Sequence, residues 1–192
     1  MLSEIKDKIK PWVESAARPF AKIGLAPNHI TVIALSVGIV AGSLFAFERQ
    51  ILAALVLLLG GFFDMIDGAV ARLTGRVTDF GGVMDSVLDR FTDAALYIGI
   101  MFGGFGTFSS LSHWIFPVFA LLGSLMVSYV RARAEAAGTG ELDVGIAERA
   151  ERLMILAVGA LLSLISYALV IIIVLSFFTV GQRMWASYKR LS

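Results

Sequence analysis

The chain has 192 residues, of which 58% are hydrophobic and only 16% charged, and its mean hydropathy is +0.84. This composition excludes an ordinary water-soluble domain and indicates a single integral membrane domain. The lack of cysteine excludes disulfide bonds and thiolate metal sites, and a net charge of +1 gives no reason to expect a nucleic-acid partner.

The N-terminal segment, residues 1–26, alternates lysines with apolar residues such as Trp12 and Phe20. This pattern predicts an amphipathic helix that lies in the membrane interface. We expect the helix to be interrupted at Pro11 and Pro19, because proline lacks the backbone N–H that a helix interior requires.

Residues 27–192 contain apolar stretches that reach the roughly 20 residues needed to cross a membrane as a helix. They are too long for barrel strands, and backbone groups in lipid must bond within their own segment. We therefore predict an all-α integral membrane protein with six transmembrane helices that form one catalytic domain. The predicted spans are approximately Asn28–Phe47, Gln50–Thr74, Thr78–Phe102, His113–Ala136, Ala147–Leu164 and Tyr167–Tyr188.

Basic residues are distributed unevenly between the two sides that these spans define. With a cytoplasmic N-terminus, Arg49 is the one arginine or lysine outside, and nearly all others fall inside. By the positive-inside rule, both termini face the cytoplasm of a multi-pass protein, which we assign to the plasma membrane.

The second and third spans carry carboxylates, which cost at least about 2.5–3.5 kcal/mol each at the bilayer centre and therefore indicate function. Asp64 and Asp67 are three residues apart, and Asp85 and Asp89 are four apart, so each pair shares one helix face. A short cytoplasmic turn separates the two spans. The pairs should therefore reach similar depths, below the cytoplasmic surface.

Four carboxylates at one depth repel each other, so either several are protonated or cations lie among them. Hard oxygen ligands favour Mg²⁺ or Mn²⁺, and four of them can bridge two ions.

An ion or proton transporter also uses intramembrane carboxylates, but it favours midplane sites and inverted repeats, and we find no repeat. A structural scaffold has no use for clustered charge.

The stretch Asp64-x2-Asp67-Gly68-x2-Ala71-Arg72-x8-Gly81-x3-Asp85-x3-Asp89 resembles the signature of the CDP-alcohol phosphatidyltransferases at every motif position. The resemblance extends over nearly the whole chain. It implies that Asp64, Asp67, Asp85 and Asp89 hold the metal ions and that Asp89 is also the catalytic base. It further implies a homodimer and a CDP-lipid site formed by Asn28, His29, Ile30, Thr31, Gly68, Ala71, Arg72 and Thr78.

Arginines near the cytoplasmic ends of the later spans predict a phosphate on the acceptor alcohol, because a guanidinium binds phosphate oxygens bidentately. These residues are Arg131, Arg149, Arg152 and Arg183. The cluster is similar to that of the inositol-phosphate branch, which implies CDP-diacylglycerol or CDP-archaeol and inositol 1-phosphate as substrates. Glycerol 3-phosphate, the acceptor of phosphatidylglycerophosphate synthase, is the alternative. Topology alone also places arginines here.

Several residues near the motif are predicted to be structural. We expect Asp93 to make a structural hydrogen bond, Arg90 to pair with Asp93, and Asp79 to begin the third span, where its charge favours the helix dipole. Gly38 and Gly42 have the small-xxx-small spacing of closely packed helices.

Overall fold

The computed structural model describes residues 2–107 and 111–192, with side chains from residue 11 onward. All regular elements within these ranges are α-helices. In chain order they are α1 (Leu2–Lys22), α2 (Pro27–Ala46), α3 (Gln50–Thr74), α4 (Asp79–Phe102), α5 (Ile115–Ala136), α6 (Arg149–Leu161) and α7 (Ile165–Leu191).

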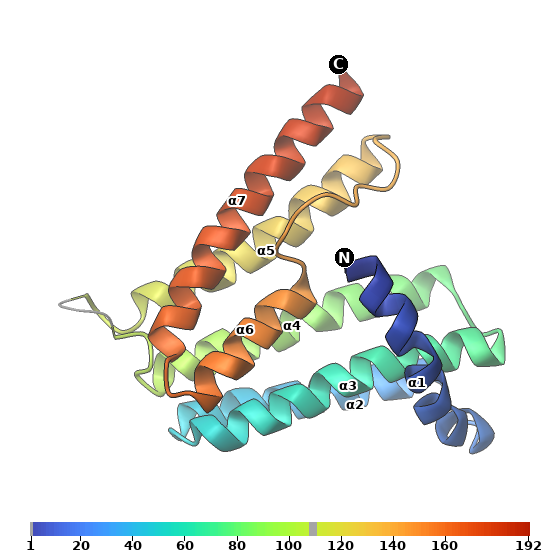
Figure 1. The fold of residues 1–192 in the computed structure, drawn as a ribbon, viewed down its shortest axis with the longest axis horizontal. Helices are drawn as coiled ribbons and strands as arrows, with labels where there is room; N and C mark the ends of the chain where they lie inside the picture. Colours follow the sequence, from blue (N-terminus) through green and yellow to red (C-terminus); the bar gives the residue numbers. More distant parts are fainter. Residues whose placement is uncertain (1, 108–110) are drawn as a thin grey trace.

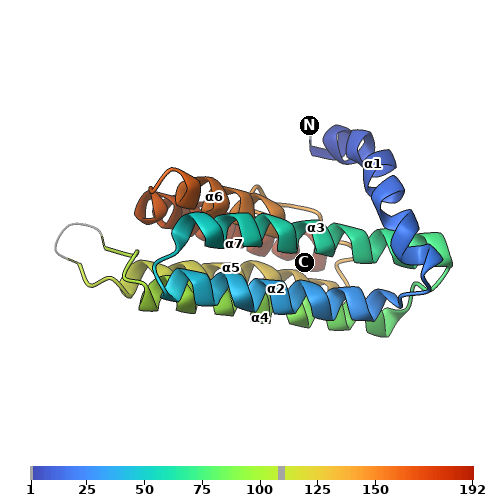
Figure 2. The ribbon, with the colours of Figure 1, turned by 90° about the horizontal axis from the view of Figure 1, so that it is seen from below.

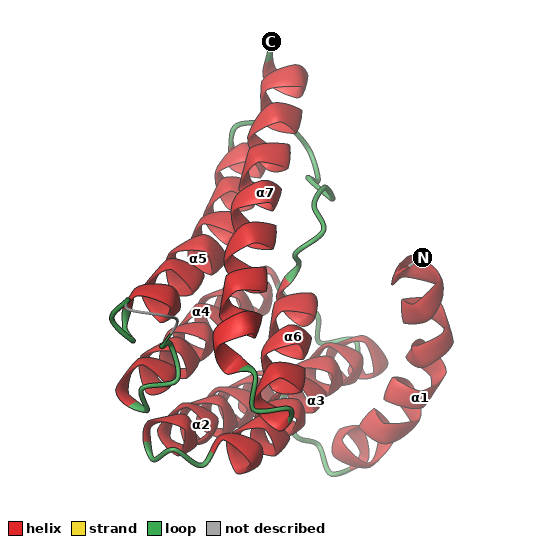
Figure 3. Cartoon of the chain, turned by 60° about the vertical axis from the view of Figure 1, so that its left-hand side comes forward, coloured by secondary structure: helices red, strands yellow, loops and turns green. Residues whose placement is uncertain are grey.

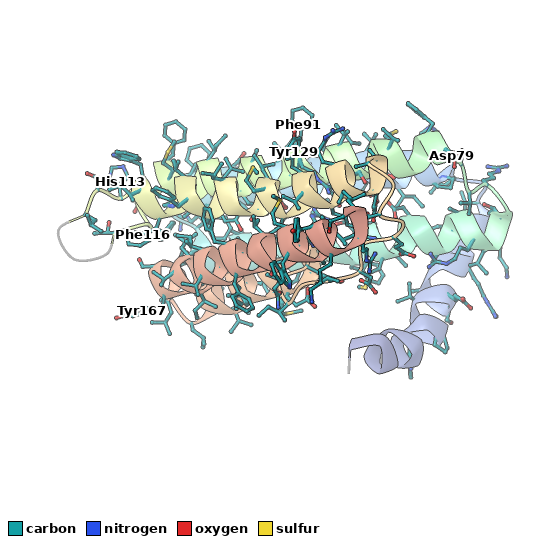
Figure 4. All side chains as sticks on the ribbon, turned by 90° about the horizontal axis from the view of Figure 1, so that it is seen from above. Asp79, Phe91, His113, Phe116, Tyr129 and Tyr167 are labelled. Atoms are coloured by element: carbon teal, nitrogen blue, oxygen red, sulfur yellow. The ribbon has the colours of Figure 1, made fainter. Side chains whose placement is uncertain are left out.

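The helices form two groups (Figure 1). α2 packs against α3 and α4, and these three run alongside one another, whereas α5 and α7 pack together and cross that group obliquely. α6 contacts both α3 and α7 and therefore joins the two groups, as Figures 2 and 3 show. Asp79, at the start of α4, lies at the opposite end of the bundle from His113 (Figure 4).

Four helices are long and apolar enough to cross a membrane, namely α2, α3, α5 and α7, so the chain is a multi-pass membrane protein. With 24 residues, α4 is long enough to cross a membrane, but its acidic residues exclude it from this apolar group. The predicted fifth span, Ala147–Leu164, is helical over only 13 residues, Arg149–Leu161, or about 20 Å. The preceding connection, residues 137–148, is irregular, and several of its backbone groups bond to side chains of α5, α6 and α7.

α1 packs against α3, and the predicted interruptions do not occur. The helix continues through Pro11 and Pro19, although each proline removes one backbone donor from the helix interior. Ala17 is fully buried against Ile66 and Val70 of α3, beside Ile30 of α2. α1 therefore packs on the C-terminal half of α3, the helix that carries Asp64 and Asp67.

Close contact between α2 and α4 depends on glycines from both helices. A Cβ on Gly38 would overlap Thr92, one on Gly42 would overlap the carbonyl of Ala95, and one on Gly99 would overlap the carbonyl of Gly42. The predicted role of Gly38 and Gly42 in close helix packing is confirmed. The contact fixes α4 directly against α2.

Replacing Gly99 by alanine should destabilise the protein, because the new methyl group meets backbone that cannot rotate away. We expect a loss of about 1–3 kcal/mol in unfolding free energy, the usual cost of overpacking, measured as a lower thermal midpoint in detergent. Gly61→Ala is the matched control, since nothing lies within 4 Å of a Cβ at that position. Equal midpoints for the two variants would contradict this account of the interface.

Candidate active site

The motif helices are joined by a turn whose geometry the sequence explains. Gly75 ends α3 in the left-handed conformation with φ of 65°, which glycine adopts without strain. Thr78 then caps α4, because its hydroxyl oxygen accepts a hydrogen bond from the backbone N–H of Gly81 at 3.0 Å. Asp79 is the first residue of α4, as predicted.

A cavity of about 320 Å³ lies beside this turn, between α2, α3 and α4. Six of the predicted CDP-lipid contacts line it: Asn28, Thr31, Gly68, Ala71, Arg72 and Thr78. Asp67 and Asp85 lie in the same wall. The two other predicted contacts are elsewhere, since Ile30 is fully buried in the cluster beneath α1 and His29 is exposed outside the lining.

The lining also contains residues that the sequence reasoning did not assign to the lipid site. Arg76 and Val77 come from the turn, Pro27 from the start of α2, and Gly82 from the first turn of α4. Arg76 could have been predicted from the sequence, because a basic residue directly after the helix-ending Gly75 lies at the mouth of any site between these helices. The cavity thus has two arginines, Arg72 and Arg76, at the end where the turn closes it.

Asp67 has the environment of a cation ligand. It is 7% exposed, and its Oδ2 atom is buried without a hydrogen-bond partner. A buried carboxylate oxygen without a partner is costly unless a cation or donor approaches it. Together with Asp85 in the same wall, it provides the hard oxygen donors that Mg²⁺ and Mn²⁺ prefer, so these residues fit a divalent ion.

The other two motif aspartates are paired with an arginine. Arg149 Nη1 contacts Asp64 Oδ2 and lies 2.7 Å from Asp89 Oδ1, and Arg149 Nε lies 3.2 Å from Asp93 Oδ1. The four predicted metal ligands therefore form two pairs. Asp64 and Asp89 contact Arg149, whereas Asp67 and Asp85 line the cavity. No three acidic or histidine side chains of the described residues converge closely enough to hold one ion.

Asp93 and Arg90 differ in part from their predicted roles. Asp93 is structural, as expected, but it acts as a buried anion between Arg149 and Arg152, whose Nη2 lies 3.6 Å away. Arg90 does not pair with Asp93. It donates to the carbonyl of Ser86 and lies 3.7 Å from Asp89, because α4 directs Asp93 towards α6 instead.

The remaining predicted acceptor arginines are also engaged. Arg152 is 2% exposed and donates to the carbonyl of Ala147 at 2.6 Å, whereas Arg183 is 3% exposed and donates to the carbonyls of Val127 and Val144. Arg131 is half-exposed and pairs with Glu135 at 2.9 Å. Arg152 and Arg183 thereby fix the irregular connection before α6, and Ala147 N–H adds a bond to Thr179.

Comparisons with known proteins show which proteins the chain is similar to. The family model of the CDP-alcohol phosphatidyltransferases matches residues 24–186. The archaetidylinositol phosphate synthase of Pyrococcus horikoshii is 41% identical over 191 residues, which cover all of this chain and 98% of the relative. The phosphatidylinositol phosphate synthase of Mycobacteroides abscessus is 34% identical over 178 residues, or 88% of this chain and 80% of the relative.

Solved structures of phosphatidylinositol phosphate synthase from Mycobacterium tuberculosis share the fold, with a TM-score of 0.81 at 31% identity. One contains bound CDP-DAG and aligns with 92% of this chain and 93% of its own. The other is a complex with manganese and citrate, aligned over 92% and 88%. The chain therefore belongs to the CDP-alcohol phosphatidyltransferase family and is a CDP-alcohol phosphotransferase.

Proposed function

We propose that this enzyme transfers a phosphatidyl or archaetidyl group from a CDP-lipid to inositol 1-phosphate and releases CMP. The observation that carries the proposal is the arrangement of the motif. Two of its aspartates line a cavity between α2, α3 and α4, and the other two lie on an arginine that begins α6. Both kinds of relative named above make a lipid inositol phosphate by name.

The cavity is the proposed site for the CDP part of the lipid. Asn28 and Thr31 approach it from α2, Gly68 and Ala71 leave room along α3, and Arg72 lies beside Gly68. Arg72 and Arg76 suit the pyrophosphate, because guanidinium groups bind phosphate oxygens strongly. Two exposed apolar residues beside the cavity, Val77 in the turn and Phe80 at the start of α4, offer lipid chains a path into the membrane.

Asp64, Asp67, Asp85 and Asp89 would hold the divalent ions, which we propose to be two Mg²⁺ or Mn²⁺. Bound there, the ions would neutralise the pyrophosphate and stabilise the departing CMP. The unpartnered Oδ2 of Asp67 supports this assignment. The aspartates themselves fix where the pyrophosphate can lie, beside Arg72 and below the α3–α4 turn.

Asp89 is the proposed base. The inositol hydroxyl oxygen attacks the β-phosphorus, the bond between that phosphorus and the CMP oxygen breaks, and Asp89 takes the hydroxyl proton. Asp89 suits this role because its side chain retains 18% exposure and lies between the cavity and α6, so an acceptor can reach it.

The acceptor phosphate would lie near the start of α6, where Arg149 is the first helical residue. A helix N-terminus favours an anion, and the arginine adds a bidentate donor. Arg131, Arg152 and Arg183 complete the proposed set, with Arg152 and Arg183 already buried nearby. Glycerol 3-phosphate would satisfy the same charge requirement, which makes it the competing acceptor.

We further propose six membrane spans, formed by α2 to α7, with α1 lying in the interface. Both termini and the catalytic cavity would face the cytoplasm across the plasma membrane, in agreement with the basic residues at the cavity end. The active form would be a homodimer, and the lipid would be diacyl or archaeol according to the host membrane.

An acceptor panel tests the proposal directly. Purified protein, CDP-lipid and Mg²⁺ are incubated with inositol 1-phosphate, glycerol 3-phosphate, serine or free inositol, and CMP release is measured. We expect inositol 1-phosphate to be used at least about tenfold better than free inositol, since each charge-assisted hydrogen bond to phosphate contributes about 1.5–3 kcal/mol. Preference for glycerol 3-phosphate would identify the competing activity. No CMP release with any of these acceptors would contradict the proposed reaction.

A further inference from the structure

Arg149 occupies a position that is unfavourable for a cation on its own helix. It is the first residue of α6, where the helix dipole is positive, and its side chain is only 20% exposed. Three carboxylates offset this, namely Asp64 from α3 and Asp89 and Asp93 from α4. The aspartates of two other helices therefore hold the guanidinium in place.

Two of these three carboxylates, Asp64 and Asp89, belong to the proposed metal-binding set. A divalent ion and a guanidinium compete for the same carboxylate oxygens and repel each other at such short range. We infer that Arg149 is a built-in counter-cation, which occupies Asp64 and Asp89 in the metal-free enzyme and leaves them when divalent ions bind. The inference rests on the proposed metal site.

Asp93 determines where the displaced guanidinium goes. It lies outside the family motif, and its two oxygens contact Arg149 Nε and Arg152 Nη2. Asp93 can therefore retain the Nε side of Arg149 while the Nη atoms leave Asp64 and Asp89. Those Nη atoms then become available to the acceptor phosphate, so metal binding prepares the acceptor site. By linkage, the coupling acts equally in both directions.

The test is a titration of the whole chain in detergent with Mn²⁺ alone. Binding is monitored by calorimetry and by the manganese paramagnetic resonance signal. For Arg149→Gln we expect the Kd for Mn²⁺ to fall by about tenfold, within the usual range of coupling between two sites. The thermal midpoint in EDTA should fall, and the rise on adding Mn²⁺ should exceed that of the wild type. Arg149→Lys should be intermediate, because one ammonium cannot bridge three carboxylates.

Arg133→Gln is the matched control. It removes the same charge from an exposed position on α5, and we expect its Kd for Mn²⁺ to equal that of the wild type. Equal Kd values for wild type and Arg149→Gln would overturn the inference while leaving the proposed function intact. Absence of Mn²⁺ binding in every protein would instead refute the proposed metal site.

If Arg149→Gln fails to fold, the double variant Arg149→Gln/Asp93→Asn answers the same question. It removes the cation together with one of its anions, so the net charge of the site is unchanged. Tighter Mn²⁺ binding than in the wild type would support displacement of Arg149, and unchanged or weaker binding would overturn it.

Discussion

Asp89→Asn should lower the rate of CMP release by about 10²–10⁴-fold, the usual contribution of a positioned general base. Asparagine preserves the shape of the side chain and can still accept a hydrogen bond from Arg149, which lies 2.7 Å from Asp89. The amide cannot take the proton of the inositol hydroxyl. The measurement is CMP release from CDP-lipid with saturating inositol 1-phosphate and Mg²⁺.

Asp79→Asn provides the control, because Asp79 lies at the start of α4 and lines none of the described cavity. Its loss should cost only about 0.3–1 kcal/mol of helix-dipole stabilisation, with turnover retained. The thermal midpoint of Asp89→Asn should stay near that of the wild type. If Asp89→Asn turned over as fast as Asp79→Asn, another residue would have to be the base.

The helix pair that carries the motif could be predicted closely from sequence, and α3 has the predicted bounds, Gln50–Thr74. The reason is local, since a long apolar run, the helix-ending Gly75 and the cap at Thr78 all depend on neighbouring residues. The spacing of the aspartates likewise fixed which helix face each occupies. The six predicted CDP-lipid contacts that line the cavity came from the resemblance to the family signature rather than from local geometry.

The contacts of Arg149 could not be predicted from neighbouring residues in the sequence. Its contacts with Asp64 and Asp89 join residues 85 and 60 positions apart, on helices whose packing depends on the glycines of α2 and α4. The sequence indicated only that several carboxylates are protonated or that cations lie among them. Arg149 supplies part of the positive charge that the carboxylates need. No local sequence pattern around Arg149 revealed this.

The pairing of aspartates with Arg149 also determines the expected effect of removing divalent ions. Removing divalent ions with EDTA should reduce CMP release to the rate without enzyme, because the pyrophosphate then meets Asp67 and Asp85 as bare anions. The fold should persist, since Arg149 still pairs with Asp64, Asp89 and Asp93, and Arg152 adds a second positive charge beside Asp93. Activity should return when Mg²⁺ or Mn²⁺ is added in excess, and EDTA preloaded with Mg²⁺ serves as the control.

The thermal midpoint separates a catalytic role of the ions from a structural one. Losing an ion that was present at about one hundred times its Kd removes about 2.7 kcal/mol of linked stability for each site. This loss lowers the midpoint but leaves a folded protein by gel filtration and far-ultraviolet circular dichroism. Unfolding in EDTA would mean that the pairs with Arg149 are not sufficient to hold the carboxylates in place. Turnover that survives chelation would remove the metal from the proposed reaction, because the four aspartates would then act on the pyrophosphate without a cation.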